Sequence, residues 1–126
     1  MKRILVIEDN AANLKLVTVL LHNAHHVVLS AEDAESGIAL ARATHPDLIL
    51  MDVQLPGMDG LAATAILKRD PVTAAIPVIA LTAMAMKDDE QKSQEAGCDG
   101  YIAKPLRYQE LCAAVDSLLD QDAVPA

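Results

Sequence analysis

Four short runs of consecutive apolar residues, rich in Val, Ile and Leu, constrain the fold of this chain more than any other feature. They cover residues 4–7, 27–29, 48–51 and 78–81, and a weaker fifth run covers residues 101–103. A strand with one solvated face alternates apolar and polar residues, whereas a strand buried on both faces is apolar throughout. The runs therefore predict the strands of a parallel sheet that is covered on both faces.

Apolar residues at helical spacing predict a helix in four of the intervals after these runs. In chain order the apolar stripes consist of Leu14, Leu16, Val17, Leu20 and Leu21; of Ile38, Leu40 and Ala41; of Leu61, Ala65 and Ile66; and of Leu111, Val115, Leu118 and Leu119.

The remaining interval lies between the fourth and fifth strands. Its predicted helix, the fourth in chain order, has no apolar stripe. Residues 87–95 read KDDEQKSQE, which are all polar, and Gly97 is placed to end the helix in a left-handed conformation. A solvated surface helix and a weakly anchored helix that can shift both fit this pattern.

Five strands alternating with five helices predict an α/β fold, the (βα)₅ doubly wound three-layer sandwich of flavodoxin-like proteins. The parallel five-stranded sheet of this fold has the order 2-1-3-4-5. No repeat or linker divides the chain, so we expect one domain over residues 1–120 and a C-terminal tail over residues 121–126.

Composition excludes several classes of function. Ten Lys and Arg against 18 Asp and Glu give a net charge of −8, which disfavours binding to nucleic acid and to anionic membranes. No apolar run approaches the roughly 18 residues of a membrane span. Cys98 and Cys112 are isolated and form no zinc motif. These features predict a cytoplasmic protein.

Polar residues follow four of the five predicted strands. Glu8 and Asp9 follow the first strand, Asp52 the third, Thr82 the fourth and Lys104 the fifth. Alone, each is a common helix cap, turn residue or surface charge. Ligands of doubly wound sheets, however, bind at the carboxyl ends of the strands. The occurrence of polar residues after four strands therefore favours one common site. The second strand brings no such group and fits the sheet edge.

The residue types in this set fit phosphoryl transfer. Three carboxylates repel one another unless a cation joins them, and Mg²⁺ (or Mn²⁺) prefers oxygen ligands. Lys104 and Thr82 supply an ammonium and a hydroxyl group for phosphoryl oxygens. A metal, these two groups and a carboxylate nucleophile are the parts needed to move a phosphoryl group onto an aspartate.

The chain resembles the receiver domains of two-component response regulators, the CheY-like family, over residues 1 to about 120. The stretches that carry the resemblance are ILVIEDN (4–10), PDLILMDVQLPGMDG (46–60), PVIALTA (77–83) and AGCDGYIAKP (96–105). The stretches GCDGYIAKP and ALTAMAMK are also similar to stand-alone cell-cycle or phosphorelay receivers and to receivers of hybrid histidine kinases.

The resemblance implies that Asp52 accepts a phosphoryl group from a phosphohistidine of a histidine kinase or a histidine phosphotransfer protein. It implies that Glu8 and Asp9 bind Mg²⁺ together with Asp52 and the main-chain carbonyl of Gln54. Such a protein is a phosphoacceptor rather than an enzyme, acts as a monomer or weak dimer, and signals to a downstream protein target.

The resemblance also implies a switch. Thr82, Ala83 and Lys104 would bind the phosphoryl oxygens, and Tyr101 occupies the position of the switch aromatic of the family. Phosphorylation would draw Thr82 inward, let Tyr101 rotate, and change the surface of the fourth helix, fifth strand and fifth helix. A partly buried strand residue with a solvated hydroxyl is the alternative role for Tyr101.

Three further positions follow from the family pattern. The Lys104–Pro105 bond would be cis, which turns the chain sharply. Gln54 and Met84 lie where receivers tune the loss of the phosphoryl group, and neither is a general base. We therefore expect a longer-lived acyl phosphate than in receivers with acidic or amide side chains at both positions.

The rival readings have specific weaknesses. A haloacid-dehalogenase-type phosphatase also uses Asp and Mg²⁺, but it needs a second Asp where this chain has Gln54. A nucleotide-binding domain lacks its glycine-rich loop. His22, His25 and His26 cross from a helix end into a strand, which favours a turn over a metal site.

The context of the domain has two readings. The chain is a stand-alone receiver, or it is a receiver excised from a hybrid histidine kinase or a multidomain response regulator. Met1 near the first strand and the short tail favour the stand-alone form.

Overall fold

The computed structural model describes residues 2–82, 87–103 and 107–122 of the 126-residue chain. The predictions made for Ala83, Met84, Lys104 and Pro105 lie outside the described residues.

The five predicted strands are confirmed, and all of them pair in parallel. Each predicted run agrees with the observed strand to within two residues at either end. The strands form one sheet in the predicted order β2-β1-β3-β4-β5. They are β1 (Arg3–Ile7), β2 (Val27–Ala31), β3 (Leu48–Asp52), β4 (Val78–Thr82) and β5 (Gly100–Ala103).

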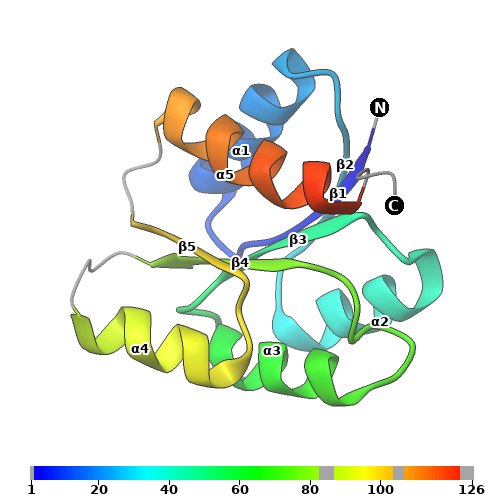
Figure 1. Ribbon diagram of the computed structural model, residues 1–126, viewed down its shortest axis with the longest axis vertical. Coiled ribbons are helices and arrows are strands. Elements are labelled where there is room, and N and C mark those ends of the chain that lie inside the picture. The colour runs from blue at the N-terminus through cyan, green and yellow to red at the C-terminus, as the bar shows by residue number, and fades with distance from the viewer. Residues whose placement is uncertain (1, 83–86, 104–106, 123–126) are drawn as a thin grey trace.

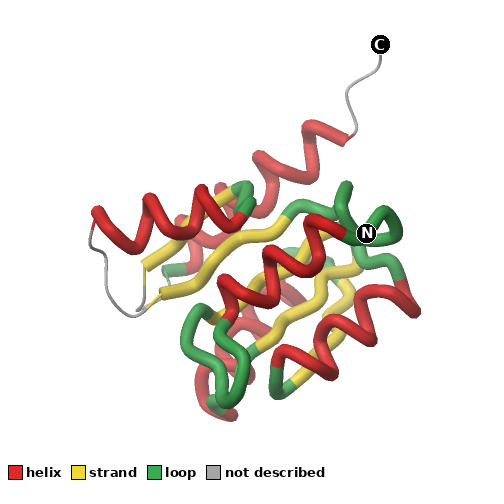
Figure 2. The backbone as a smooth tube through the Cα atoms, turned by 90° about the horizontal axis from the view of Figure 1, so that it is seen from below, coloured by secondary structure: helices red, strands yellow, loops and turns green. Residues whose placement is uncertain are grey.

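Helices cover both faces of this sheet. Figure 1 shows α1 and α5 on one face and α2, α3 and α4 on the other, and Figure 2 shows the strands as the middle layer. None of the helices in the described ranges is long and apolar enough to cross a membrane. The helices are α1 (Ala11–Asn23), α2 (Ala34–Thr44), α3 (Gly60–Arg69), α4 (Lys87–Ala96) and α5 (Tyr108–Asp122).

Alternate residues of each central strand fill two separate hydrophobic cores. Ile4 and Val6 of β1 pack with α1 and α5, whereas Leu5 and Ile7 pack with α2 and α3. The same division holds along β3, where all five residues are buried. Side chains of successive strand residues point to opposite faces, so a continuous apolar run is what a sheet with two covered faces requires.

Short polar side chains start the helices that follow the first three strands. Asn10, Asp33 and Asp59 are the N-caps of α1, α2 and α3. Each side chain accepts a hydrogen bond from the backbone amide three residues further on, at 2.8–3.0 Å. A cap of this kind stabilises a helix by about 1 kcal/mol, so each strand passes into its helix through a locally closed turn.

The buried face predicted for α3 was wrong. Gly60, Ala63, Thr64 and Leu67 are its buried residues, whereas Ile66 of the predicted stripe is 37% exposed. The helix lies so close to the sheet that only small residues fit its first turns, and this outweighs the preference for larger apolar side chains. In α1 the error was limited to Leu16, which is 44% exposed.

Lys68 and Asp99 join α3 to the amino ends of β4 and β5. The Lys68 ammonium donates to the carbonyl oxygen of Ile76 at 2.8 Å and pairs with Asp99 Oδ2 at 2.9 Å. The same carboxylate oxygen accepts from the amide of Val78 at 2.9 Å. Gly97 has a φ of 102°, which confirms the left-handed position predicted after α4.

The turn between α1 and β2 gives a prediction for the pH dependence of stability. His25 has a φ of 67° and forms the turn, as predicted. Burial lowers the pKa of His26, although Asp116 opposes this shift, and its Nδ1 is buried without a hydrogen-bond partner among the described residues. The unfolded chain therefore binds a proton more readily at this residue than the folded chain does.

We expect the His26 contribution to the free energy of unfolding to be fully present above about pH 6.5 and to be lost as the pH falls through the lower pKa of the folded state. Denaturant titrations of the parent and of His26→Asn between about pH 5 and pH 8 measure this contribution. The variant should show the shallower dependence on pH. Equal slopes for the two proteins would contradict the prediction.

Candidate functional site

The fold brings the predicted acidic residues to one edge of the sheet. Glu8 and Asp9 directly follow β1, and Asp52 is the last residue of the neighbouring strand β3. Oxygen atoms of these three carboxylates lie within 4.8 Å of one another. The carboxyl ends of parallel strands meet at the same edge, so residues 44 positions apart in the sequence share a single site.

The three carboxylates differ in their exposure to solvent. Glu8 is 1% exposed and Asp52 is 3% exposed, whereas Asp9 is exposed. Two acidic side chains are thus held inside the protein and the third lies at the surface beside them. Burial of ionised carboxylates is unfavourable unless a cation or hydrogen-bond donors stabilise the charge.

Backbone amides donate to both buried carboxylates. The Asn10 amide donates to Glu8 Oε1 at 3.2 Å, and the Gln54 amide donates to Asp52 Oδ1 at 3.0 Å. An Asp side chain that bonds the amide two residues on forms a turn and limits its own rotation. This bond gives Gln54 a role through its backbone amide, in addition to the roles predicted for its carbonyl and its side chain.

Gly60 is a further residue of the site, and no role was predicted for it from the sequence. Its amide donates to the carbonyl oxygen of Val53 at 2.9 Å, which places the start of α3 against the loop after Asp52. A Cβ atom at this position would overlap the Asp52 carbonyl group, with its carbon 2.8 Å away. Only glycine allows this approach, so Gly60 determines how closely α3 packs behind Asp52.

Thr82 and Tyr101 continue the site from β3 across the neighbouring strands β4 and β5. Thr82 ends β4 and is 3% exposed, and its strand pairs with β3 so that Leu81 lies beside Asp52. Tyr101 is half-buried on β5, beside Ala80 of β4. Thr82 therefore lies at the same sheet edge as the carboxylates, and Tyr101 lies two residues before the end of the adjacent strand.

The donor set fits a hard divalent cation. All three side chains offer carboxylate oxygens, which are the ligands that Mg²⁺ and Mn²⁺ prefer. Among the residues that the structure describes, this is the only cluster of three His, Cys, Asp or Glu side chains with metal-binding geometry.

Comparison with known proteins assigns this arrangement to a family. The family model described as the response regulator receiver domain matches residues 4–116. The polar-differentiation response regulator DivK of Brucella ovis is 41% identical over 118 residues, covering 94% of this chain and 96% of that protein.

Solved structures agree with this assignment. The receiver domain of the sensor histidine kinase PA1611 from Pseudomonas aeruginosa, with a magnesium ion coordinated in its active-site cleft, is 31% identical with a TM-score of 0.88. The alignment covers 94% of this chain and 98% of that one. The signal receiver domain of a histidine kinase from Syntrophus aciditrophicus is also 31% identical, with a TM-score of 0.89 and coverage of 96% and 92%.

Proposed function

The chain belongs to the response regulator receiver domain family of two-component systems, and on that premise we propose that Asp52 is the residue that accepts the phosphoryl group. One observation carries the proposal: the Asp52 carboxylate is buried at the carboxyl edge of the sheet, within 4.8 Å of the carboxylates of Glu8 and Asp9. The amide of Gln54 limits rotation of this carboxylate by bonding Oδ1, which favours a single orientation of the nucleophile.

Glu8, Asp9 and Asp52 would hold Mg²⁺, with the main-chain carbonyl of Gln54 as a further ligand. The bound ion supplies positive charge that lets a phosphoryl group approach a carboxylate. Three clustered carboxylates support this assignment, as does the magnesium ion in the active-site cleft of the PA1611 receiver domain. Mn²⁺ has the same ligand preferences and is expected to substitute.

In the proposed reaction an oxygen of Asp52 attacks the phosphorus of a phosphohistidine. The new O–P bond forms as the N–P bond breaks, and the imidazole nitrogen keeps the electron pair and takes up a proton from water. Thr82 would donate its hydroxyl to a phosphoryl oxygen. Lys104 and Ala83 would bind the other oxygens, an assignment that rests on the sequence pattern.

The output of the domain would be a change of protein surface rather than catalysis on another substrate. Thr82 and Tyr101 lie on the adjacent strands β4 and β5, and α4 packs against β5 and α3. A shift of Thr82 toward a phosphoryl group and a rotation of Tyr101 would alter this side of the molecule. The donor would be a histidine kinase or a histidine phosphotransfer protein, and the recipient of the signal a downstream protein.

Residues 1–120 would constitute the receiver domain and residues 121–126 its tail, although α5 extends through Asp122, two residues into that tail. The protein would be cytoplasmic. This location accords with a phosphoryl donor of the kinase class.

Small-molecule phosphorylation tests the proposal. The protein is incubated with phosphoramidate, with Mg²⁺ or with a chelator, and its intact mass is measured. We expect the mass of one phosphoryl group to be added in the presence of Mg²⁺ and little addition with the chelator. Equal incorporation under both conditions would contradict the assignment of the acidic cluster.

Mg²⁺ alone is expected to raise the melting temperature, because the three carboxylates come together only in the folded chain. Differential scanning fluorimetry at increasing Mg²⁺ concentration measures the shift. Asp9→Asn is the informative variant, since Asp9 is exposed and its replacement leaves the buried residues in place. The variant should show a clearly smaller shift than the parent, and an undiminished shift would remove Asp9 from the metal site.

A further inference from the structure

Within the described ranges 2–82, 87–103 and 107–122, the strand β2 at the edge of the sheet leaves part of its backbone without a partner. The Val27 amide donates to the carbonyl of Lys2, and the carbonyl of Ala31 accepts from the amide of Glu8. The backbone groups of alternate residues point to opposite sides of a strand. Val27, Leu29 and Ala31 therefore bond β1, and Val28 and Ser30 direct their N–H and C=O groups away from the sheet.

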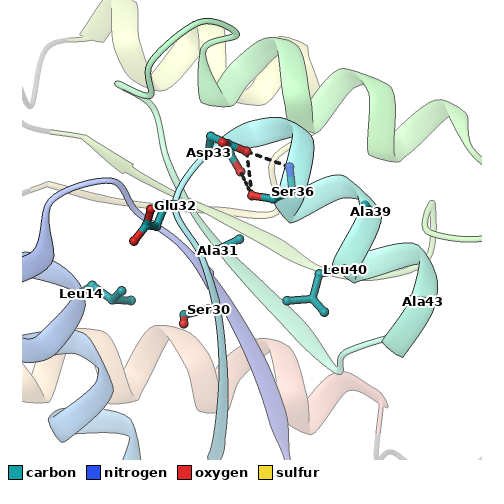
Figure 3. Close-up of a pocket in the computed structure, with 9 residues that line it drawn as sticks. All are labelled: Leu14, Ser30, Ala31, Glu32, Asp33, Ser36, Ala39, Leu40 and Ala43. Carbon is teal, nitrogen blue, oxygen red and sulfur yellow. Dashed lines mark hydrogen bonds between the residues drawn. The ribbon is translucent and has the colours of Figure 1, made fainter.

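A groove runs along this edge and leaves it accessible. It has a volume of about 660 Å³ and lies between α1 and α2. Figure 3 shows Ser30 on β2 between Leu14 of α1 and Leu40 of α2. Ala39 and Ala43 complete the α2 side, and their small side chains leave room for another strand beside β2. An open strand edge beside apolar side chains is a template for pairing with a further strand.

We propose that the β2 edge is a self-association surface, on which two copies of this chain pair their β2 strands antiparallel about a two-fold axis. A two-fold interface uses the same patch on both copies, so the patch must be complementary to itself. The pairing that uses all the outward backbone groups joins Val28 of each copy to Ser30 of the other. Leu29 of one copy then lies opposite Leu29 of the second copy.

The charges along β2 fit this antiparallel register. Glu32 and Asp33 lie at the carboxyl end of the groove, as Figure 3 shows, and hydrogen bonds from Ser36 keep the pKa of Asp33 low. Lys2, His25 and His26 lie at the other end of β2. The proposed register places Glu32 beside His26 of the second copy and Asp33 beside His25, so acidic groups face imidazole side chains, which can donate hydrogen bonds, rather than each other.

The dimer is expected to be weak, because each copy carries a net charge of −8 and the two copies repel. Sedimentation velocity over a concentration series up to about 1 mM measures the dissociation constant, which we expect in the micromolar to millimolar range. A parent protein that stays monomeric throughout the series would overturn the proposal. It would be overturned in the same way if the groove of that monomer binds a foreign peptide.

Proline at position 30 tests whether the outward backbone groups make the interface. Ser30→Pro removes an amide hydrogen that does not bond β1, so the sheet of each copy is retained. We expect it to weaken dimerisation about tenfold or more, whereas Ser30→Ala, which keeps the amide, should change the dissociation constant less than about twofold. Circular dichroism and melting temperature verify that both variants fold. Equal dissociation constants for the two variants would overturn the proposed pairing.

Cysteine cross-linking tests the register independently. In a background with Cys98 and Cys112 replaced by alanine, Leu29→Cys places two thiols directly opposite each other, at a distance suited to a disulfide. Val27→Cys, two residues away on the same strand, would face Ala31 of the second copy. Mild oxidation should cross-link the first variant and leave the second largely monomeric. Equal cross-linking of both would overturn the register.

Discussion

Asp52→Asn is expected to abolish Mg²⁺-dependent incorporation of a phosphoryl group. The amide side chain has no carboxylate oxygen to attack phosphorus, and it also removes one of the three anionic groups that lie within 4.8 Å of one another. Asp52 is 3% exposed and nearly isosteric with Asn, so the fold should be retained. Intact mass after incubation with phosphoramidate and Mg²⁺ measures the loss. We expect incorporation below about one hundredth of the parent, as for removal of a nucleophile.

Asp59→Asn is the matched control for this experiment. Asp59 lies seven residues after Asp52, is exposed, and caps α3 by accepting from the Ala62 amide at 2.8 Å. Asn caps a helix about as well as Asp, so both the stability and the labelling of this variant should resemble those of the parent. Labelling of Asp52→Asn at the parental level would remove Asp52 from the proposed role. Loss of labelling in Asp59→Asn would indicate that any charge change near the site has the same effect.

Gly60→Ala is expected to lower the free energy of unfolding by about 3 kcal/mol and to impair phosphorylation as well. A Cβ atom would come within 2.8 Å of the Asp52 carbonyl carbon and 2.9 Å of the Val53 Cα. Both atoms belong to the backbone and cannot rotate away. Either α3 moves outward or the end of β3 shifts, and the second response displaces the Asp52 carboxylate. Urea denaturation measures the stability, and the intact-mass assay measures the phosphorylation.

Gly57→Ala separates this contact from the ordinary effect of replacing a glycine. Gly57 has a φ of 76°, and a Cβ atom there would meet nothing within 4 Å. Its replacement should therefore destabilise the protein only through the left-handed backbone, by about 1 kcal/mol. The two positions lie three residues apart, Gly57 in the loop before α3 and Gly60 at the first residue of the helix. If the two variants lose equal stability, the close approach of α3 to Asp52 has no special role.

The strands β1, β3 and β4 could be predicted from the sequence because they are buried on both faces, and continuous apolar runs leave little choice of structure. The acidic cluster followed from the same topology, since Glu8 and Asp52 end neighbouring strands. The face of α3 could not be predicted in this way. The orientation of α3 is set by the close approach of Gly60 to the Asp52 backbone. Because glycine has no side chain, this contact does not show in a pattern of apolar side chains.

The hydrogen bond from the Gln54 amide to Asp52 was missed for a related reason. Side-chain identity at position 54 suggested a role in tuning dephosphorylation, whereas the structure adds a role for the backbone of the same residue. Any residue other than proline can donate this bond, so it leaves no signature in the identity of residue 54. The tuning of phosphate lifetime by Gln54 and Met84 stays a prediction.

The capped starts of α1, α2 and α3 have an electrostatic consequence for the acidic edge. Each helix begins directly after a strand or its loop, so three helix amino termini gather where Glu8, Asp9 and Asp52 lie. Each amino terminus carries roughly half a positive elementary charge from its aligned peptide dipoles. The fold therefore supplies fixed positive potential to the edge where its own carboxylates cluster. A phosphoryl dianion bound there would meet a less negative environment than the formal charges of the side chains alone imply.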